Sequence, residues 1–133
     1  MPASVTVRVE WEMGHRLPNH NGACRNLHGH HYVAEATVSG EINTVPLSSS
    51  EGMVVDFTTI KDRLRHEVLK LDHKFLLHRY DMFVGDMSHL AGVVLVDFVP
   101  TAENIALALL GAIPQIERIK LWETPTSYAE VWR

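Results

Sequence analysis

Cysteine is nearly absent from this chain of 133 residues, in which Cys24 is the only one. A single cysteine cannot form an intrachain disulfide, which fits a reducing compartment. It also excludes a zinc finger, which needs several thiolates, and a zinc nucleobase deaminase, which needs a Pro-Cys-x-x-Cys run.

Long apolar runs and an excess of positive charge are missing as well. The longest apolar run, residues 90–96, is far too short to span a membrane. The first five residues lack the basic and apolar regions of a signal peptide. Twelve Lys and Arg against sixteen Asp and Glu give a net charge of −4, which argues against binding nucleic acid mainly through phosphates. We therefore expect a soluble, cytoplasmic protein with no nucleic-acid or membrane partner.

The overall composition is that of an ordinary globular domain. Apolar residues make up 46% of the chain and charged residues 21%, both near the averages of soluble proteins. A chain of this length has room for one hydrophobic core. We therefore expect residues 1–133 to form a single domain.

Two segments alternate in the manner of strands with one buried face. The odd positions are apolar in residues 4–13, and the even positions of residues 28–39 share one face. Residues 14–27, rich in Gly, Pro and Asn, indicate a loop between them, and residues 41–52 a second surface loop. Further strands are predicted over residues 93–99 and 116–124.

Two other segments have the periodicity of amphipathic helices. The first has Thr58 or Thr59 as a plausible N-cap, and the second begins after Thr101, its expected N-cap. Gly111 and Pro114 end or kink the second helix. The apolar positions of the first are Ile60, Leu64, Val68 and Leu71. Antiparallel strands with helices packed on one face make an α+β domain.

Histidine is the residue type in excess, with nine in the chain, and neutral imidazole is the commonest metal ligand. His28 and His30 are two apart at the start of a predicted strand, so both side chains leave the same face. His15 has the parity of the apolar face at the end of the first strand. We predict that these three histidines bind one metal ion and leave a fourth position open, as in catalytic zinc sites. The alternative is three unrelated polar histidines. Surface or supporting positions are expected for His20, His31, His66, His78 and His89.

Cys24 lies four residues before His28, in the loop above the proposed metal. A thiol near a cation can be a reactive thiolate at neutral pH. The alternative is a small, inert buried residue, the usual state of a single cysteine. The spacing alone favours neither interpretation.

Two other places carry acidic or basic side chains with possible chemistry. Asp72 and His73 follow the first helix, and Asp72 can orient His73 for proton transfer if the helix has ended there. By themselves, these residues are better explained by a helix C-terminus at which His73 complements the dipole. Glu123 has the parity of an apolar strand face, where it needs a partner with adjacent N–H donors. Otherwise it is simply solvated at the end of the strand.

Six short motifs occur in order along nearly the whole chain. They are Gly14–Leu17, Cys24-x-x-x-His28-Gly29-His30, Gly52–Phe57, Leu71–His73, Pro100–Asn104 and Trp122–Thr124. Together they resemble the 6-pyruvoyl-tetrahydropterin synthase family and its bacterial 6-carboxytetrahydropterin synthase branch. The gap of three residues between Cys24 and His28 resembles the carboxy-forming branch, because the pyruvoyl-forming animal enzymes have a longer one. A third branch carries Glu in place of the cysteine, so Cys24 argues against it.

The resemblance implies the tunnelling fold, in which small α+β subunits join their sheets into a ring. Family members are commonly homohexamers of two stacked trimers, with each site at a subunit boundary. By analogy, zinc is held by His15, His28 and His30 and acts as a Lewis acid on the substrate side chain.

The resemblance also implies a substrate, 7,8-dihydroneopterin triphosphate. Cys24 would accept a proton, with Asp72 and His73 as its relay, and Glu123 would clamp the pterin. Thr101 and Glu103 lie where the family lines the pterin pocket. In the carboxy branch triphosphate and acetaldehyde are lost, and 6-carboxy-5,6,7,8-tetrahydropterin feeds 7-deazaguanine synthesis, as in queuosine. The alternatives are a 6-pyruvoyl-tetrahydropterin synthase, which only eliminates triphosphate, and a non-catalytic pterin- or metal-binding homologue.

The chain departs from the family pattern in two places. The Asn that usually follows the Leu-Asp-His motif is missing, and residues 78–99 are longer than in typical bacterial members. Either difference would alter the pocket rim or the contacts between subunits. Local cations must compensate the acidic chain near a triphosphate, and the candidates are Arg16, Arg25 and Lys74.

Overall fold

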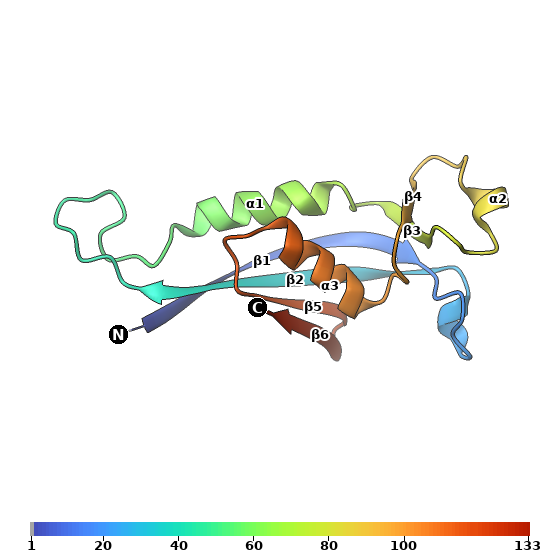
Figure 1. Cartoon of the computed structure of the whole chain (residues 1–133), viewed down its shortest axis with the longest axis horizontal. Coiled ribbons are helices and arrows are strands. Elements are labelled where there is room, and N and C mark those ends of the chain that lie inside the picture. The colour runs from blue at the N-terminus through green and yellow to red at the C-terminus, as the bar shows by residue number, and fades with distance from the viewer. Residues whose placement is uncertain (1) are drawn as a thin grey trace.

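The computed structural model describes residues 2–133, which form one six-stranded sheet with helices on one face (Figure 1). The strand order is β4-β3-β1-β2-β5-β6. The strands are β1 (Pro2–His15), β2 (His28–Glu41), β3 (Lys74–His78), β4 (Val93–Val96), β5 (Arg118–Thr124) and β6 (Ser127–Trp132). The helices are η1, a 3-10 turn (Ala23–Arg25), α1 (Phe57–Leu69), α2 (Val84–Met87) and α3 (Ala102–Ala112).

The long antiparallel pair of β1 and β2 confirms the predicted alternation. Their register runs without a bulge from Pro2 opposite Glu41 to His15 opposite His28. The apolar side chains of β1 and the small ones of β2 face the helices; they are Val7, Val9, Trp11, Met13, Ala34 and Ala36. Because the alternation is unbroken, His15 stays on this buried face and is almost fully enclosed.

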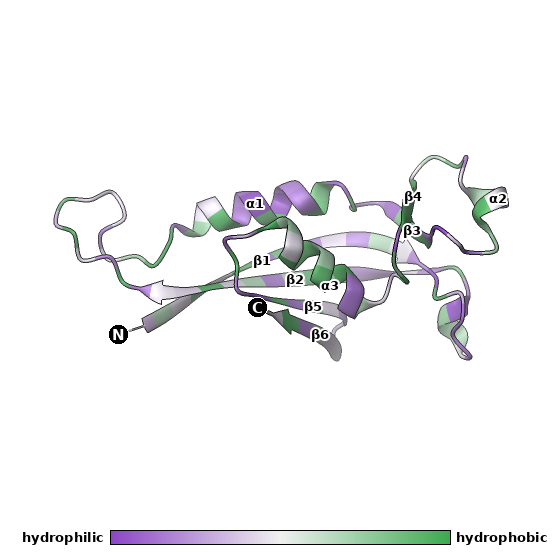
Figure 2. Cartoon of the chain, viewed as in Figure 1, coloured by the Kyte–Doolittle hydropathy of each residue, from purple (hydrophilic) through white to green (hydrophobic). Residues whose placement is uncertain are grey.

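The helices α1 and α3 lie side by side over this face of the sheet (Figure 1). α1 buries Ile60, Leu64 and Val68. Its N-cap is neither Thr58 nor Thr59 but Asp56, whose carboxylate accepts from the Thr58 N–H at 2.8 Å. Figure 2 shows hydrophilic residues along α1, whereas α3 is hydrophobic through most of its length. α3 has the expected N-cap, since Thr101 accepts from the Asn104 N–H at 3.1 Å.

The prediction of an antiparallel sheet is wrong in one part, because β1 pairs in parallel with β3, and β3 with β4, so the sheet is mixed. β3 is an unpredicted strand of five residues, and β4 ends at Val96 rather than at residue 99. The chain turns from α1 into β3 at His73, which has a φ of 60°. Its backbone N–H donates to the Glu12 carbonyl at 2.7 Å, which ties the turn to β1.

The chain ends in an antiparallel pair of β5 and β6, of which only β5 was predicted. An irregularity of register between Trp122 and Thr124 separates the last residues of β5 from the regular ladder. The α+β class with helices on one face is confirmed. In the described residues, no helix is both long enough and apolar enough to cross a membrane.

Candidate active site

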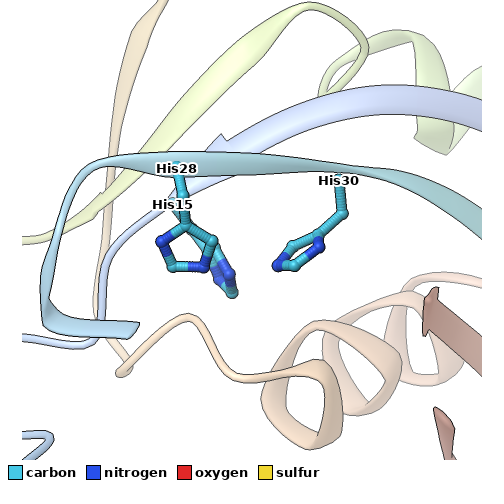
Figure 3. A group of neighbouring side chains, drawn as sticks. All are labelled: His15, His28 and His30. Atoms are coloured by element: carbon cyan, nitrogen blue, oxygen red, sulfur yellow. The ribbon is translucent and has the colours of Figure 1, made fainter. Parts of the chain in front are cut away.

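The three predicted metal ligands converge at one end of the sheet, from the end of β1 and the start of β2 (Figure 3). One ligand nitrogen from each of His15, His28 and His30 lies within 4.8 Å of the others. The ring centroids are 4.5 to 5.2 Å apart. Three separate positions in the sequence therefore offer one compact set of nitrogen donors, as predicted.

Backbone carbonyls orient two of the imidazoles. His15 Nδ1 lies 2.6 Å from the Pro100 carbonyl oxygen, and His28 Nδ1 lies 2.7 Å from that of Asn26. With Nδ1 donating to a carbonyl, Nε2 is left as the free donor for a metal. The Nε2 atoms of His28 and His30 are buried and have no hydrogen-bond partner in the described residues. Buried polar atoms need partners, so this donor set fits a divalent metal such as zinc.

Burial keeps two of the histidines, His15 and His30, in the form that binds metals. It lowers the pKa of His15 and of His30, and this outweighs the opposing effect of the Glu123 carboxylate. The neighbouring imidazole of His28 also lowers both pKa values. The neutral form, which is the ligand, is therefore favoured at neutral pH.

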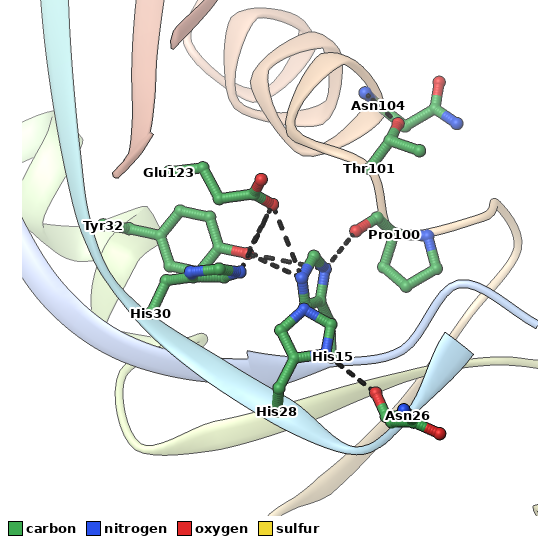
Figure 4. A network of polar contacts seen from close by, with 9 residues as sticks. All are labelled: His15, Asn26, His28, His30, Tyr32, Pro100, Thr101, Asn104 and Glu123. Atoms are coloured by element: carbon green, nitrogen blue, oxygen red, sulfur yellow. Dashed lines mark hydrogen bonds and ion pairs between the residues drawn. The ribbon is translucent and has the colours of Figure 1, made fainter. Parts of the chain in front are cut away.

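Glu123 and Tyr32 stand beside the three imidazoles (Figure 4). Glu123 Oε1 lies 3.4 Å from His15 Nε2 and 3.7 Å from His30 Nε2. The Tyr32 hydroxyl is 3.5 Å from the same carboxylate oxygen. Burial raises the pKa of Tyr32, and Glu123 raises it further, so the phenol keeps its proton. The carboxylate on the apolar face therefore points into the site, although the sequence pattern alone also allowed a solvated position.

Cys24 lies in η1, at the same end of the sheet as the histidines (Figure 1). Its backbone carbonyl accepts from the Leu17 N–H at 2.8 Å, which closes the loop. The residue is half-buried rather than enclosed in the core. Its thiol is near enough to Tyr32 to influence the pKa of the phenol. Of the two interpretations, an accessible thiol beside the site fits this position better than an inert core residue.

Asp72 and His73 form a pair where the chain turns into β3. His73 Nδ1 lies 2.8 Å from Asp72 Oδ1, and that carboxylate also accepts from the Glu12 N–H at 3.2 Å. The helix has ended by this point, as the pair requires. The His73 side chain is 78% exposed and lines a hollow with Glu12, His31 and, from the histidine cluster, His30.

A larger hollow of about 650 Å³ opens between the start of β2 and the end of β5. Its lining includes His30 and Glu123, but most of it comes from the sheet face opposite the helices, with Arg8, Glu10, His31, Glu35 and Trp122. Its size suits a small ligand. Of the two expected pocket residues, Glu103 shares a smaller, adjoining hollow with Glu123. The Thr101 hydroxyl instead caps α3.

Arg16 does not face solvent near the site, because it is 4% exposed and paired with Asp81. Its Nε lies 2.8 Å from Asp81 Oδ2, and its guanidinium stacks over the Phe83 ring at 4.3 Å. The pair anchors the segment before α2 to the end of β1. Arg16 is therefore not available to bind a triphosphate, and Arg25 and Lys74 remain as candidates.

Known proteins match this chain over nearly its whole length. A family model described as 6-pyruvoyl tetrahydropterin synthase matches residues 4–133. The chain belongs to the 6-pyruvoyl tetrahydropterin synthase family. Its curated relatives carry the name of the carboxy-forming branch. The 6-carboxy-5,6,7,8-tetrahydropterin synthase of Rickettsia bellii is 41% identical, over 95% of this chain and 97% of the relative. That of Haemophilus influenzae is 31% identical, over 95% and 96%.

Solved structures confirm the tunnelling-type fold of the family. An uncharacterized protein from Wolinella succinogenes superposes with a TM-score of 0.83 at 21% identity, over 99% of this chain and 98% of that chain. The 6-pyruvoyl tetrahydropterin synthase of Plasmodium falciparum has a TM-score of 0.78 at 22% identity, with the same coverage.

Sequence reasoning missed two groups of this site. Pro100 acts through its carbonyl oxygen, which no side-chain pattern reveals. Tyr32 had a usable signal, since it shares the strand face of His28 and His30 and follows them directly.

Proposed function

We propose that this protein converts 7,8-dihydroneopterin triphosphate to 6-carboxy-5,6,7,8-tetrahydropterin, with loss of triphosphate and acetaldehyde. The observation that carries the proposal is the convergence of three imidazoles beside Glu123, two of which have a buried Nε2 without a hydrogen-bond partner in the described residues, with Cys24 in the adjoining turn. The names of the curated relatives support the carboxy-forming branch. The product would enter 7-deazaguanine synthesis, in the cytoplasm.

We assign the metal to His15, His28 and His30, and zinc is the ion that this donor set fits best. When bound, zinc would supply Lewis acidity toward oxygens of the substrate side chain. The chain's own contribution is to favour the neutral form of His15 and His30 through burial, and to orient His15 and His28 through the carbonyls of Pro100 and Asn26.

Glu123 is the proposed anchor for the pterin. Its carboxylate can accept two parallel hydrogen bonds from the 2-amino group and the adjacent ring N–H. The hollow of about 650 Å³ next to it has the volume for a pterin ring. Glu103 lies in the adjoining hollow and is a second candidate for this pocket.

Cys24 is the proposed proton acceptor, and Asp72 and His73 are its proposed relay. Because no hydrogen bond or ion pair joins that pair to Cys24 in the described residues, we propose that it serves the site of a neighbouring subunit in a homo-oligomer, a hexamer by family resemblance. The exposure of His73 and its hydrogen bond with Asp72 support this arrangement.

The reaction is tested with zinc-loaded protein and 7,8-dihydroneopterin triphosphate, and the products are identified by mass. The mass of 6-carboxy-5,6,7,8-tetrahydropterin together with acetaldehyde supports the proposal. The mass of the 6-pyruvoyl product without acetaldehyde indicates the sibling synthase. Tight pterin binding without turnover indicates a non-catalytic homologue.

The shared site is tested by co-expressing Cys24→Ala and His73→Ala chains, each inactive alone. If one subunit supplies the thiol and another the imidazole, mixed oligomers contain some complete sites and regain turnover. Activity that stays absent in mixed oligomers contradicts the shared arrangement.

A further inference from the structure

Tyr32 is held in one orientation by its surroundings. The residue is completely buried on the helix-facing side of β2. Its ring stacks on Trp11, with centroids 5.5 Å apart and planes 18° from parallel. The rings of His15 and His30 meet it edge-on at 6.1 and 5.6 Å. A ring fixed on three sides leaves its hydroxyl little freedom to choose a partner.

The hydroxyl has three polar neighbours and one good acceptor among them (Figure 4). It lies 3.4 Å from His15 Nδ1, 3.5 Å from His15 Nε2 and 3.5 Å from Glu123 Oε1. His15 Nδ1 already donates to the Pro100 carbonyl and cannot accept. His15 Nε2 belongs to the proposed metal-binding set. The Tyr32 O–H is therefore left to donate to the carboxylate of Glu123.

Glu123 needs such a restraint. It is the second-last residue of β5, where the register becomes irregular, and its side chain is 28% exposed. Its Oε1 lies within 3.7 Å of two imidazole nitrogens. When a metal takes up those two nitrogens, the Tyr32 hydroxyl is the partner left to hold Oε1, while the carboxylate lines the hollow with Trp122 and Pro125.

We propose that Tyr32 is a positioning residue that holds Glu123 in the orientation that anchors the substrate. The proposal rests on the proposed function. Tyr32 restrains Oε1, and this keeps the plane of the carboxylate fixed for a ligand with two adjacent N–H donors. In this proposal the buried tyrosine orients a carboxylate and does not bind the metal.

The test uses Tyr32→Phe, which keeps the ring that stacks on Trp11 and removes only the hydroxyl. Tyr80→Phe is the matched control, because Tyr80 is 84% exposed. The readouts are zinc content per chain, the thermal midpoint, and the binding of neopterin to zinc-loaded protein by fluorescence. We expect Tyr32→Phe to keep its zinc and its midpoint and to bind neopterin about tenfold more weakly, as the loss of a hydrogen bond to a charged group predicts. Under turnover, KM rises while kcat changes much less.

A double-mutant cycle with Glu123→Ala then separates positioning from a general structural role. When the carboxylate is absent, removing the hydroxyl should weaken neopterin binding no further. Equal weakening in both backgrounds, or loss of zinc from Tyr32→Phe, overturns the proposal. If Tyr32→Phe binds neopterin as tightly as the wild-type protein does, the proposal is overturned as well, while the proposed function stands. Wild-type protein that binds no pterin overturns the proposed function, and the role of Tyr32 falls with it.

Discussion

His30 and His31 are neighbours on β2, yet they have opposite environments. His30 points into the site, is 20% exposed, and has a pKa lowered by burial. His31 points to the other face and is 53% exposed. There its ring nitrogens lie 3.0 Å from Glu10 and 2.5 Å from Glu12, and hydrogen bonds to the two carboxylates raise its pKa. The alternation of a strand therefore decides which of two adjacent histidines is suited to bind metal and which is suited to carry charge.

The largest contrast is expected when each histidine is removed in turn. His30→Ala takes away one of three nitrogen ligands and should lower zinc affinity on the order of 100-fold or more. His31→Ala removes a side chain on the far face and should keep one zinc per chain. Metal content after dialysis against a chelator measures both variants. Equal retention of zinc in the two would contradict the assignment of His30.

A second variant separates the metal ligands from the proposed proton acceptor beside them. Cys24→Ala should retain zinc, because its thiol is not in the predicted donor set, but should lower kcat by about 10²- to 10⁴-fold through the loss of a proton acceptor. Single-turnover measurements on zinc-loaded protein test this. An unchanged rate would eliminate the cysteine mechanism.

The contrast between a buried and an exposed environment extends to two ion pairs. Arg16 and Asp81 are enclosed, whereas the pair of Arg79 and Asp97 is more than half exposed. Asp81→Asn leaves the Arg16 charge buried without a counter-ion and should cost about 3–5 kcal/mol of folding free energy. Asp97→Asn should cost less than about 1 kcal/mol. Urea denaturation measures the free energy of unfolding of both variants. Similar decreases in the two would mean that burial does not set the strength of the Arg16–Asp81 pair.

The smallest effect is expected from the titration of His31. Its folded-state pKa is raised, so its stabilising contribution is complete below the pKa of the unfolded state and is lost as pH rises through the folded value. The thermal midpoint of wild-type protein should therefore exceed that of His31→Gln at mildly acidic pH, with the gap closing toward alkaline pH. The control is His66→Gln, a change at an exposed position of α1. A gap that widens with rising pH would reverse the assigned sign.

Much of the site could be predicted from the sequence because it depends on strand alternation. An unbroken register carries His15 to the end of the buried face, and two-residue spacing does the same for His28 and His30. The position of Glu123 followed from the same rule, but the tyrosine that contacts it depends on how β5 lies beside β2.

Other features depend on tertiary contacts that carry no local pattern. β3 is too short to show alternation, and it is defined by pairing with β1 and β4. Arg16 reads as a surface cation until Asp81 is brought against it from a distant segment. The N-cap of α1 was misplaced because Asp56 precedes two threonines that are equally suitable by residue type.

The carbonyl that orients His15 belongs to Pro100, the residue just before the N-cap of α3. All three imidazoles come from the first thirty residues, but the group that orients one of them comes from the second half of the chain. A fragment that ends before Pro100 would contain every nitrogen donor and still lack the group that fixes the tautomer of His15. Metal binding by this protein therefore depends on the docking of α3 against the sheet. A bound metal would in turn stabilise the contact between the two halves of the chain.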